Sequence, residues 1–229
     1  MQNKGINSSD VIIKADDIKK SYGETHAMRG ISLEIKRGEV LAIMGPSGSG
    51  KSTLLHTLAG IIKPDSGKVY FGGSRIDNLN DHGRTMLRRT KFGFVFQFSQ
   101  LVPELTAIDN VAVPLLLNGI PRGEAYHRAE QWLNKVGIAD AKLNRLANQL
   151  SGGQIQRVAI ARAMVINPEV LFADEPTGSL DSLNSELVMK MFIKTAKENG
   201  TTVVMVTHEP TIAAYADREI IVRDGRVEA

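Results

Sequence analysis

"GPSGSGKS" at residues 45–52 follows the apolar run "VLAIM" and precedes a pattern that predicts a helix from Lys51 to about Ala59. Glycine adopts left-handed backbone angles at little cost, and such angles let successive N–H groups point toward one anion. The start of a helix adds positive potential at the same place. A strand, a glycine-rich turn and a helix in this order therefore predict a phosphate-binding loop within an α/β fold.

Two side chains of this phosphate loop (residues 45–52) have predicted roles. Lys51 can reach the β- and γ-phosphates of a nucleotide, and Ser52 can bind Mg²⁺. A glycine-rich turn with a surface lysine is the alternative, and the flanking strand and helix disfavour it. The residues expected to contact the nucleotide here are Gly45, Ser47, Gly48, Ser49, Gly50, Lys51, Ser52 and Thr53.

Strand and helix patterns alternate around the loop. Strands are expected at residues 11–22, 31–45, 67–73, 92–97, 169–174 and 201–208, with a closing hairpin at 219–228. This alternation implies βαβ units and a buried, mostly parallel sheet, preceded by an antiparallel β part. The sequence thus predicts one domain: a P-loop NTPase core of the RecA-like type at residues 1–97 and 156–229, with an inserted helical subdomain at 98–155.

The helical subdomain is predicted from a change of pattern, because strand signals vanish after Phe98. One helical stripe there contains Ala125, Ala129, Trp132, Leu133 and Val136, and Gly137 is a stop signal.

The stretch "VLFADE" at residues 170–175 places two carboxylates at the end of an apolar strand. Ligands bind at this end of the strands in open α/β sheets. Asp174 is expected to hold Mg²⁺, mostly through water, and Glu175 to polarise an attacking water. An acidic pair after a strand is also a common helix N-cap, but the phosphate loop favours the catalytic interpretation.

Three further residues have weaker support from the residues alone. His208 ends the strand at residues 201–208 and is a candidate contact of the γ-phosphate, with a structural histidine equally plausible. Gln97 could sense Mg²⁺ or water, although a solvated glutamine is the simpler interpretation. Tyr22 could stack on adenine or be an ordinary half-buried tyrosine. No role is assigned to His26, His56, His82 and His127.

A second glycine-rich turn opens a helix at "NQLSGGQ", residues 148–154. Ser151 can cap this helix, and Gly152 and Gly153 leave backbone N–H groups uncovered. Ile155, Val158, Ala159 and Ile166 form an apolar stripe that would hold the helix rigidly. No lysine follows the glycines, so this site can bind phosphate but cannot by itself catalyse hydrolysis. A simple capped helix is the alternative.

Composition limits the possible classes of function. The net charge of +3 is too small to argue for nucleic acid, and the basic cluster "RTMLRRTK" at residues 84–91 fits a solvated helix face. The chain has no cysteine, which excludes disulfides and thiolate metal sites. The polar N-terminus does not resemble a signal peptide, and no apolar run reaches the roughly 20 residues of a membrane span. A membrane role would therefore need a partner.

The stretch "LSGGQ" at residues 150–154, called the signature below, resembles that of ABC-type ATPases. It lies between the phosphate loop and "LFADE", in the order of that family, and the resemblance covers nearly the whole chain. It implies that Tyr22 stacks on adenine and that Gln97 belongs to the Q-loop, where it contacts the nucleotide and is a ligand of Mg²⁺. It also implies that Glu175 is the catalytic glutamate and His208 the switch histidine. Asp181 of "SLD" would belong to the D-loop and contribute to nucleotide binding.

The family also implies why two phosphate sites are present. Two chains pair head to tail, so the signature of each, with Ser151, Gly152, Gly153 and Gln154, caps the ATP held by the other. Such a contact is isologous, and ATP binding shifts the pair toward its closed state. The helical subdomain would then pass the motion to a transmembrane permease subunit at the cytoplasmic face of the membrane.

The stretches "RRTKFGFVFQ", "LVPELTAIDNVAVPLLLNG" and "LFADEPTGSLDS" most resemble the macrolide-export and lipoprotein-release branch. The family more often has Gln where this chain has Ile155, and Ala or Asn where it has Ser179. Neither difference removes a catalytic group. The alternatives are an ATPase of another branch, such as a small-solute importer, a soluble ABC-type ATPase acting on ribosomes or DNA, and a regulator without turnover. No heptad run or second domain supports the soluble class, and nucleic acid is not an expected partner.

Overall fold

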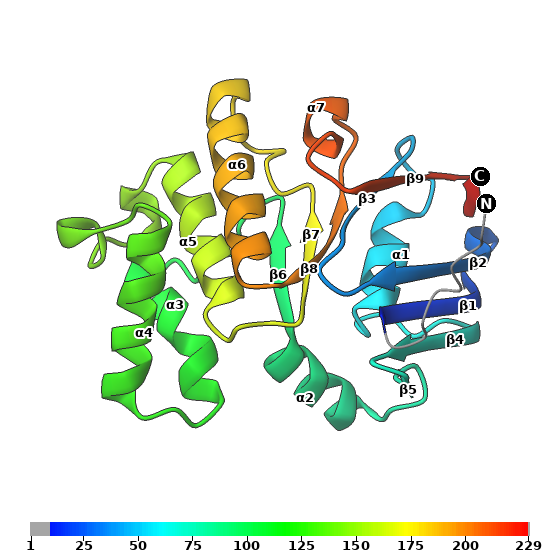
Figure 1. Cartoon of the computed structure of the whole chain (residues 1–229), viewed down its shortest axis with the longest axis horizontal. Coiled ribbons are helices and arrows are strands. Elements are labelled where there is room, and N and C mark those ends of the chain that lie inside the picture. Colours follow the sequence, from blue (N-terminus) through cyan, green and yellow to red (C-terminus); the bar gives the residue numbers. More distant parts are fainter. Residues whose placement is uncertain (1–9, 229) are drawn as a thin grey trace, which may run out of the picture.

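A six-stranded sheet forms the centre of the molecule in the computed structural model, which describes residues 10–228 (Figure 1). The strand order is β10-β9-β3-β8-β7-β6, and all neighbours are parallel except β10 and β9. The strands are β3 (Val40–Met44), β6 (Phe92–Phe96), β7 (Val170–Asp174), β8 (Thr202–Val206), β9 (Arg218–Arg223) and β10 (Arg226–Glu228). The mostly parallel sheet is confirmed.

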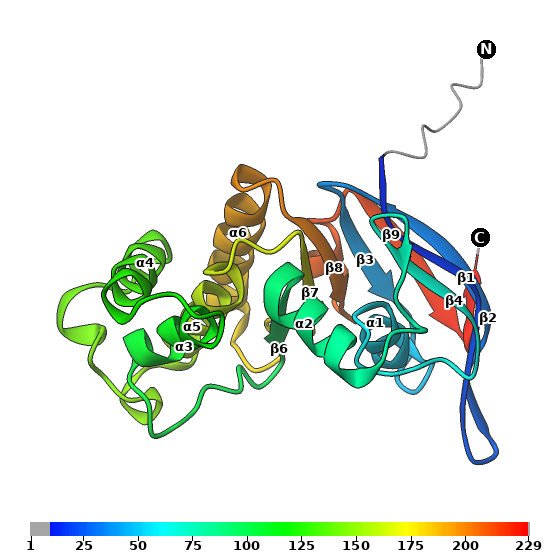
Figure 2. The ribbon, with the colours of Figure 1, turned by 90° about the horizontal axis from the view of Figure 1, so that it is seen from below.

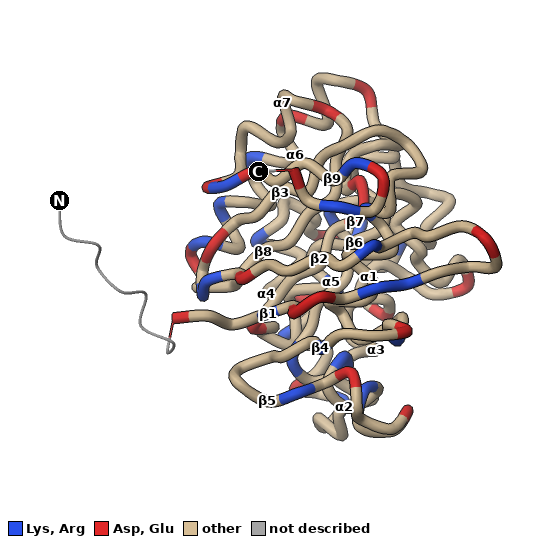
Figure 3. Tube along the Cα trace, turned by 90° about the vertical axis from the view of Figure 1, so that its right-hand side faces the viewer, with Lys and Arg blue, Asp and Glu red and all other residues tan. Residues whose placement is uncertain are grey.

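A second, antiparallel sheet precedes it in the chain, with the order β2-β1-β4-β5. Its strands are β1 (Val11–Tyr22), β2 (Thr25–Lys36), β4 (Ser66–Phe71) and β5 (Ser74–Arg75). β2 begins earlier than the expected start at residue 31, because Tyr22 pairs with Thr25 across the tight turn at Gly23. Lysines and carboxylates are interspersed along this part of the molecule (Figure 3), with Lys14 and Glu34 2.8 Å apart.

Two hydrophobic cores cover the two faces of the central sheet. In β3, Val40 and Ala42 belong to one core and Leu41 and Ile43 to the other, as the alternation of side chains along a strand requires. One core includes α1 and both sheets, and the other contains α5, α6 and the helices beyond them (Figure 2). The helices are α1 (Lys51–Leu58), α2 (Asp81–Lys91), α3 (Ala107–Leu117), α4 (Arg122–Lys135), α5 (Gly152–Met164), α6 (Ser182–Glu198) and α7 (Pro210–Ala213), with 3-10 turns at Asp140–Lys142 and Ala147–Gln149.

The predicted helical subdomain corresponds to α3, α4 and the start of α5, which lie beyond the β6 edge of the sheet (Figure 1). The predicted stripe is buried at Ala125, Ala129, Trp132, Leu133 and Val136. The proposed boundary at residues 155/156 falls inside the continuous helix α5, so the division into subdomains stays a prediction. No residue of α2 is buried, as expected for the basic cluster at residues 84–91.

Within residues 10–228, no helix has the length and apolar character needed to cross a membrane. The prediction that the N-terminus is not a signal peptide was made from residues 1–10, and residues 1–9 lie outside the described residues.

Candidate functional site

The phosphate loop connects the end of β3 to the start of α1, at the carboxyl end of the central sheet. Gly45 and Gly50 have φ angles of 141° and 101°. A Cβ at Gly45 would overlap the carbonyl oxygen of Val222, and one at Gly50 would overlap that of Ala27. Only glycine therefore fits at these two positions, and their backbone angles shape the loop.

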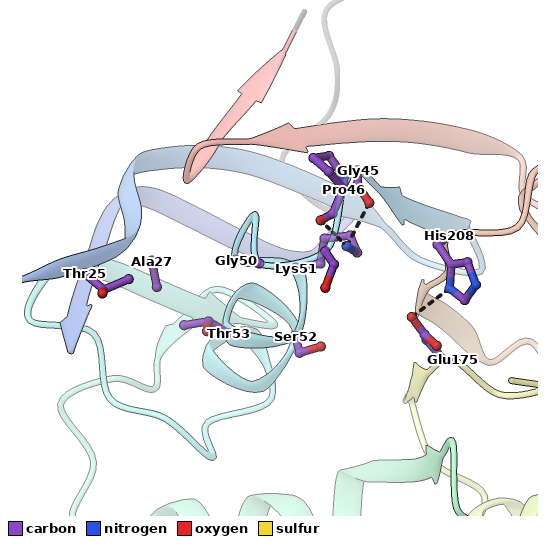
Figure 4. A pocket seen from close by; sticks show the side chains of 12 residues that line it. Thr25, Ala27, Gly45, Pro46, Gly50, Lys51, Ser52, Thr53, Glu175 and His208 are labelled. Atoms are coloured by element: carbon purple, nitrogen blue, oxygen red, sulfur yellow. Dashed lines mark hydrogen bonds and ion pairs between the residues drawn. The ribbon is translucent and has the colours of Figure 1, made fainter. Parts of the chain in front are cut away.

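Lys51 lies inside this loop (Figure 4). Its Nζ donates hydrogen bonds to the carbonyl oxygens of Gly45 at 2.8 Å and Pro46 at 2.7 Å. Burial lowers the pKa of Lys51 from its ordinary value, while the nearby carboxylates of Glu175 and Asp174 act in the opposite direction. A buried ammonium group held by neutral carbonyls is well placed to bind an anion, because phosphate oxygens would supply the charge that the carbonyls lack.

Ser52 and Asp174 bring together the first turn of α1 and the end of β7. The Ser52 hydroxyl donates to Asp174 Oδ1 at 3.1 Å. Burial raises the pKa of Asp174, and the hydrogen bond from Ser52 opposes that shift. A hydroxyl and a carboxylate oxygen are ligands that Mg²⁺ accepts, and Mg²⁺ normally keeps waters and substrate phosphates as its other ligands. The described residues contain no cluster of three or more His, Cys, Asp or Glu.

Glu175 and His208 lie next to each other on one side of the same pocket (Figure 4). Glu175 Oε1 lies 2.9 Å from His208 Nδ1, and both residues follow the ends of neighbouring strands, β7 and β8. Glu175 has a φ of 47°, a left-handed conformation that a non-glycine residue adopts only where its surroundings hold it. The geometry places a potential acid–base group beside the phosphate loop.

The pocket has a volume of about 680 Å³. Its lining residues are Thr25, Ala27, Gly45, Pro46, Ser47, Gly48, Gly50, Lys51, Ser52, Thr53, Glu175 and His208. Ser49, a residue of the loop itself, is buried, and its hydroxyl has no hydrogen-bond partner among the described residues. Tyr22 is half exposed and does not line the pocket, although it pairs with Thr25, which does. Its stacking on adenine stays a prediction.

Gln97 lies in an adjoining cavity of about 290 Å³, where β6 ends. Ser52, His56, Asp174 and Glu175 line the same cavity. The structure therefore brings Gln97 next to Ser52 and Asp174, and a role of Gln97 at Mg²⁺ stays a prediction.

The signature lies at the start of α5 and contributes no residue to the pocket around the phosphate loop. Ser151 caps α5: its hydroxyl accepts from Gln154 N at 3.4 Å, and Gln154 Oε1 accepts from Ser151 N at 3.0 Å. Asp181 caps α6 in a similar way and accepts from Asn184 N at 3.0 Å, which lowers the pKa of Asp181. In the single chain, the two glycine-rich turns are separate.

Two features near the site have no counterpart in the sequence interpretation. His56, which was assigned no role, places Nε2 3.7 Å from Asp174 Oδ2, and its spacing of one helical turn from Ser52 was the available signal. Gln156 is fully buried and bonds to both Ser99 and Pro176. No local signal distinguished Gln156, because α5 also contains the polar residues Gln154, Arg157 and Arg162.

Comparisons with known proteins agree with this geometry. A family model described as "ABC transporter" matches residues 28–178. The lipoprotein-releasing system ATP-binding protein LolD of Aquifex aeolicus is 49% identical, over 94% of this chain and 96% of that relative. The macrolide export ATP-binding/permease protein MacB of Chlorobium luteolum is 48% identical over 94% of this chain, which spans 33% of that relative.

Solved structures show the same fold. The dimeric structure of MJ0796 from Methanocaldococcus jannaschii, a bacterial ABC transporter cassette according to its description, has a TM-score of 0.87. It is 43% identical, over 95% of this chain and 97% of that chain. Another dimeric MJ0796 structure, of a post-hydrolysis state bound to ADP and Pi, has a TM-score of 0.86 at 42% identity, with the same coverage. This chain belongs to the ABC transporter family, of which it forms an ATP-binding cassette.

Proposed function

We propose that this chain binds ATP with Mg²⁺, hydrolyses it in a head-to-tail pair with a second copy, and thereby drives a separate transmembrane permease subunit. The observation that carries the hydrolytic part is the position of Glu175. Its carboxylate lies 2.9 Å from His208 and lines the same pocket as Lys51 and the phosphate loop. A phosphate-binding loop and a water-activating group thus share one pocket.

The roles of the individual side chains follow from this geometry. Lys51 and the loop N–H groups bind the phosphates, while Ser52 and Asp174, with Gln97 beside them, are the residues that would hold Mg²⁺. When bound, Mg²⁺ neutralises charge on the phosphate oxygens. Glu175 orients and polarises the attacking water, and His208 fixes the orientation of Glu175.

Pairing with a second copy is supported by the separation of the two phosphate-binding turns. The exposed residues Ser151 and Gly152 do not line the pocket that contains Lys51, so they can contact its ligand only from another molecule. The backbone N–H groups at the start of α5 then face a phosphate across the interface, where the helix N-terminus favours negative charge. The MJ0796 cassettes that resemble this chain are described as dimers.

The membrane partner and the cargo are inferred from the relatives. MacB is described as an ATP-binding/permease protein, and this chain spans a third of its length. That description, in which a related cassette works with a permease, supports a permease partner for this chain. LolD is described as the ATP-binding protein of a lipoprotein-releasing system. We therefore place this chain at the cytoplasmic face of a membrane, in a complex of the macrolide-export or lipoprotein-release type.

Release of inorganic phosphate from ATP by the purified chain, with and without Mg²⁺, tests the enzymatic part. Activity that depends on Mg²⁺ is expected, and its absence under both conditions would contradict the proposal. Purification from detergent-solubilised membranes tests the partner. A small permease with a large outer domain is expected; a many-helix importer core with a binding protein would contradict the branch, and ribosomes or DNA would support the soluble alternative.

A further inference from the structure

Gln156 joins three segments of the chain through one buried side chain. It lies on α5, two residues after the signature, and is fully buried. Its Oε1 accepts a hydrogen bond from the hydroxyl of Ser99, and its Nε2 donates one to the backbone carbonyl of Pro176. The amide therefore connects α5 to the segment after β6 and to the turn after β7.

Both partners of Gln156 are close neighbours of predicted site residues. Pro176 directly follows Glu175, and Ser99 lies two positions after Gln97. A second side chain of α5 strengthens the connection, since Arg162 donates to the carbonyl oxygens of Ser99 at 2.8 Å and Gln100 at 2.7 Å. The segment after Gln97 is thus tied to α5 at two points along the helix.

The backbone of Glu175 explains why a support at Pro176 matters. Its φ of 47° is costly for a residue with a side chain and persists only where neighbouring groups hold it. Glu175 N donates to the Val206 carbonyl at 2.9 Å, and Gly178 N donates to the Glu175 carbonyl at 3.0 Å. The bond from Gln156 holds the next peptide unit. Loss of that bond would let Glu175 relax and turn its carboxylate away from the pocket.

We propose that Gln156 is a positioning residue for ATP hydrolysis, which holds Glu175 and the segment after Gln97 in register with the helix that begins at the signature. The inference rests on the proposed function, because it concerns the same hydrolytic site. Gln156 lines neither the phosphate pocket nor the adjoining cavity, so it acts only through its two partners. If α5 shifts relative to β7, it must either carry the segments of Ser99 and Pro176 with it or break their hydrogen bonds to Gln156.

Gln156→Leu tests the inference, because leucine has a similar size but makes neither hydrogen bond. We expect kcat for ATP hydrolysis to fall about 10- to 100-fold, since small misplacements of a catalytic group have effects of this order. KM and the dissociation constant of ATP should change by less than about twofold, because the binding residues are untouched. The matched control is Gln131→Leu, which makes the same substitution at an exposed position of α4. The side chain of Gln131 forms a hydrogen bond with His127, and its replacement should leave kcat at the wild-type value.

Ser99→Ala provides a milder variant that removes one of the two bonds and leaves the bond to Pro176. A smaller fall in kcat is expected, again without loss of ATP affinity. Thermal unfolding of each variant reports the folded fraction. Wild-type kcat in folded Gln156→Leu, or a kcat loss explained by lost affinity or lost folded protein, would overturn the inference. If Gln156→Leu does not fold, wild-type kcat in Ser99→Ala overturns it. An inactive wild-type chain would instead refute the proposed function itself.

Discussion

Glu175 Oε1 lies 2.9 Å from Nδ1 of His208, although 33 positions separate the two residues in the chain. The contact arises because β7 and β8 are neighbouring parallel strands, with Asp174 paired to Val206. Parallel strands end at one edge of a sheet, so the residues that follow them meet there. The carboxylate of Glu175 is therefore positioned both by its own strand, β7, and by His208, which comes after β8.

Replacement of Glu175 by glutamine is the direct test of this carboxylate. Glu175→Gln keeps the size of the side chain but removes the group that polarises water, so kcat should fall by about 10²- to 10⁴-fold. ATP binding should persist, and ATP should trap a stable dimer, measured by light scattering. Glu186→Gln, at an exposed position of α6 paired with Lys190, is the control and should hydrolyse ATP normally. Undiminished turnover in Glu175→Gln would refute the catalytic assignment.

Substitution at Ser151 tests the contact between two copies. Ser151→Arg, made in the Glu175→Gln background, should prevent ATP-driven dimerisation, because a large cation would fill the space in which the signature meets its partner. ATP affinity of the monomer should not change, since Ser151 lies outside the pocket. Dimer formation is measured by light scattering with and without ATP.

Ser151 also caps α5, so the loss of the cap needs its own control. Ser151→Ala removes the cap without adding bulk, at a cost of about 1 kcal/mol of stability. Ser74→Arg adds the same charge at an exposed site on β5 and should leave dimerisation intact. Dimers of Ser151→Arg that form as readily as those of Ser74→Arg would rule out the contact between copies.

The two glycines Gly48 and Gly50 should respond differently to alanine. Both have positive φ angles, 77° and 101°, which alone cost an alanine about 1–2 kcal/mol. A Cβ at Gly48 meets open space, whereas one at Gly50 overlaps the Ala27 carbonyl. Gly50→Ala should therefore lose about 1–3 kcal/mol more than Gly48→Ala, as measured by urea unfolding. Equal losses would show that the close approach of β2 to the loop does not constrain Gly50.

Glu169 should make part of the stability dependent on pH. Hydrogen bonds from Lys91 and Arg37 hold the pKa of Glu169 below its ordinary value of 4.5, against the effect of burial. The ionised form is thus favoured by folding, and its contribution is present above pH 4.5 and lost as the pH falls through the folded-state pKa. The network is partly exposed, so Glu169→Gln should cost no more than about 1 kcal/mol at pH 7.

The pH profile of the unfolding free energy checks this expectation. The difference between the wild type and Glu169→Gln should shrink as the pH drops below 4.5. A constant difference across the acid range would contradict the assigned role of Glu169.

Much of the site could be predicted because its parts are local. The phosphate loop consists of consecutive residues, and the glycines alone set the backbone angles that form it. Asp174 ends β7, Glu175 comes directly after it, and His208 comes two residues after β8. The rule that ligands bind at the carboxyl ends of parallel strands therefore places them together. Tyr22 shows the limit of such rules, because its pattern predicts a strand end but not whether the ring reaches the pocket.

Local sequence patterns were sufficient to predict the α/β class, the phosphate loop and the carboxylates beside it, because strand alternation and glycine backbone angles are short-range properties. The contacts of Gln156 with Ser99 and Pro176, which are 57 and 20 positions away, depend on the folded chain. The tertiary structure also decided that Ser151 lies outside the pocket of its own chain. Both facts depend on how α5 packs against the sheet, and the energy of such packing is summed over many distant side chains, so no local pattern records it.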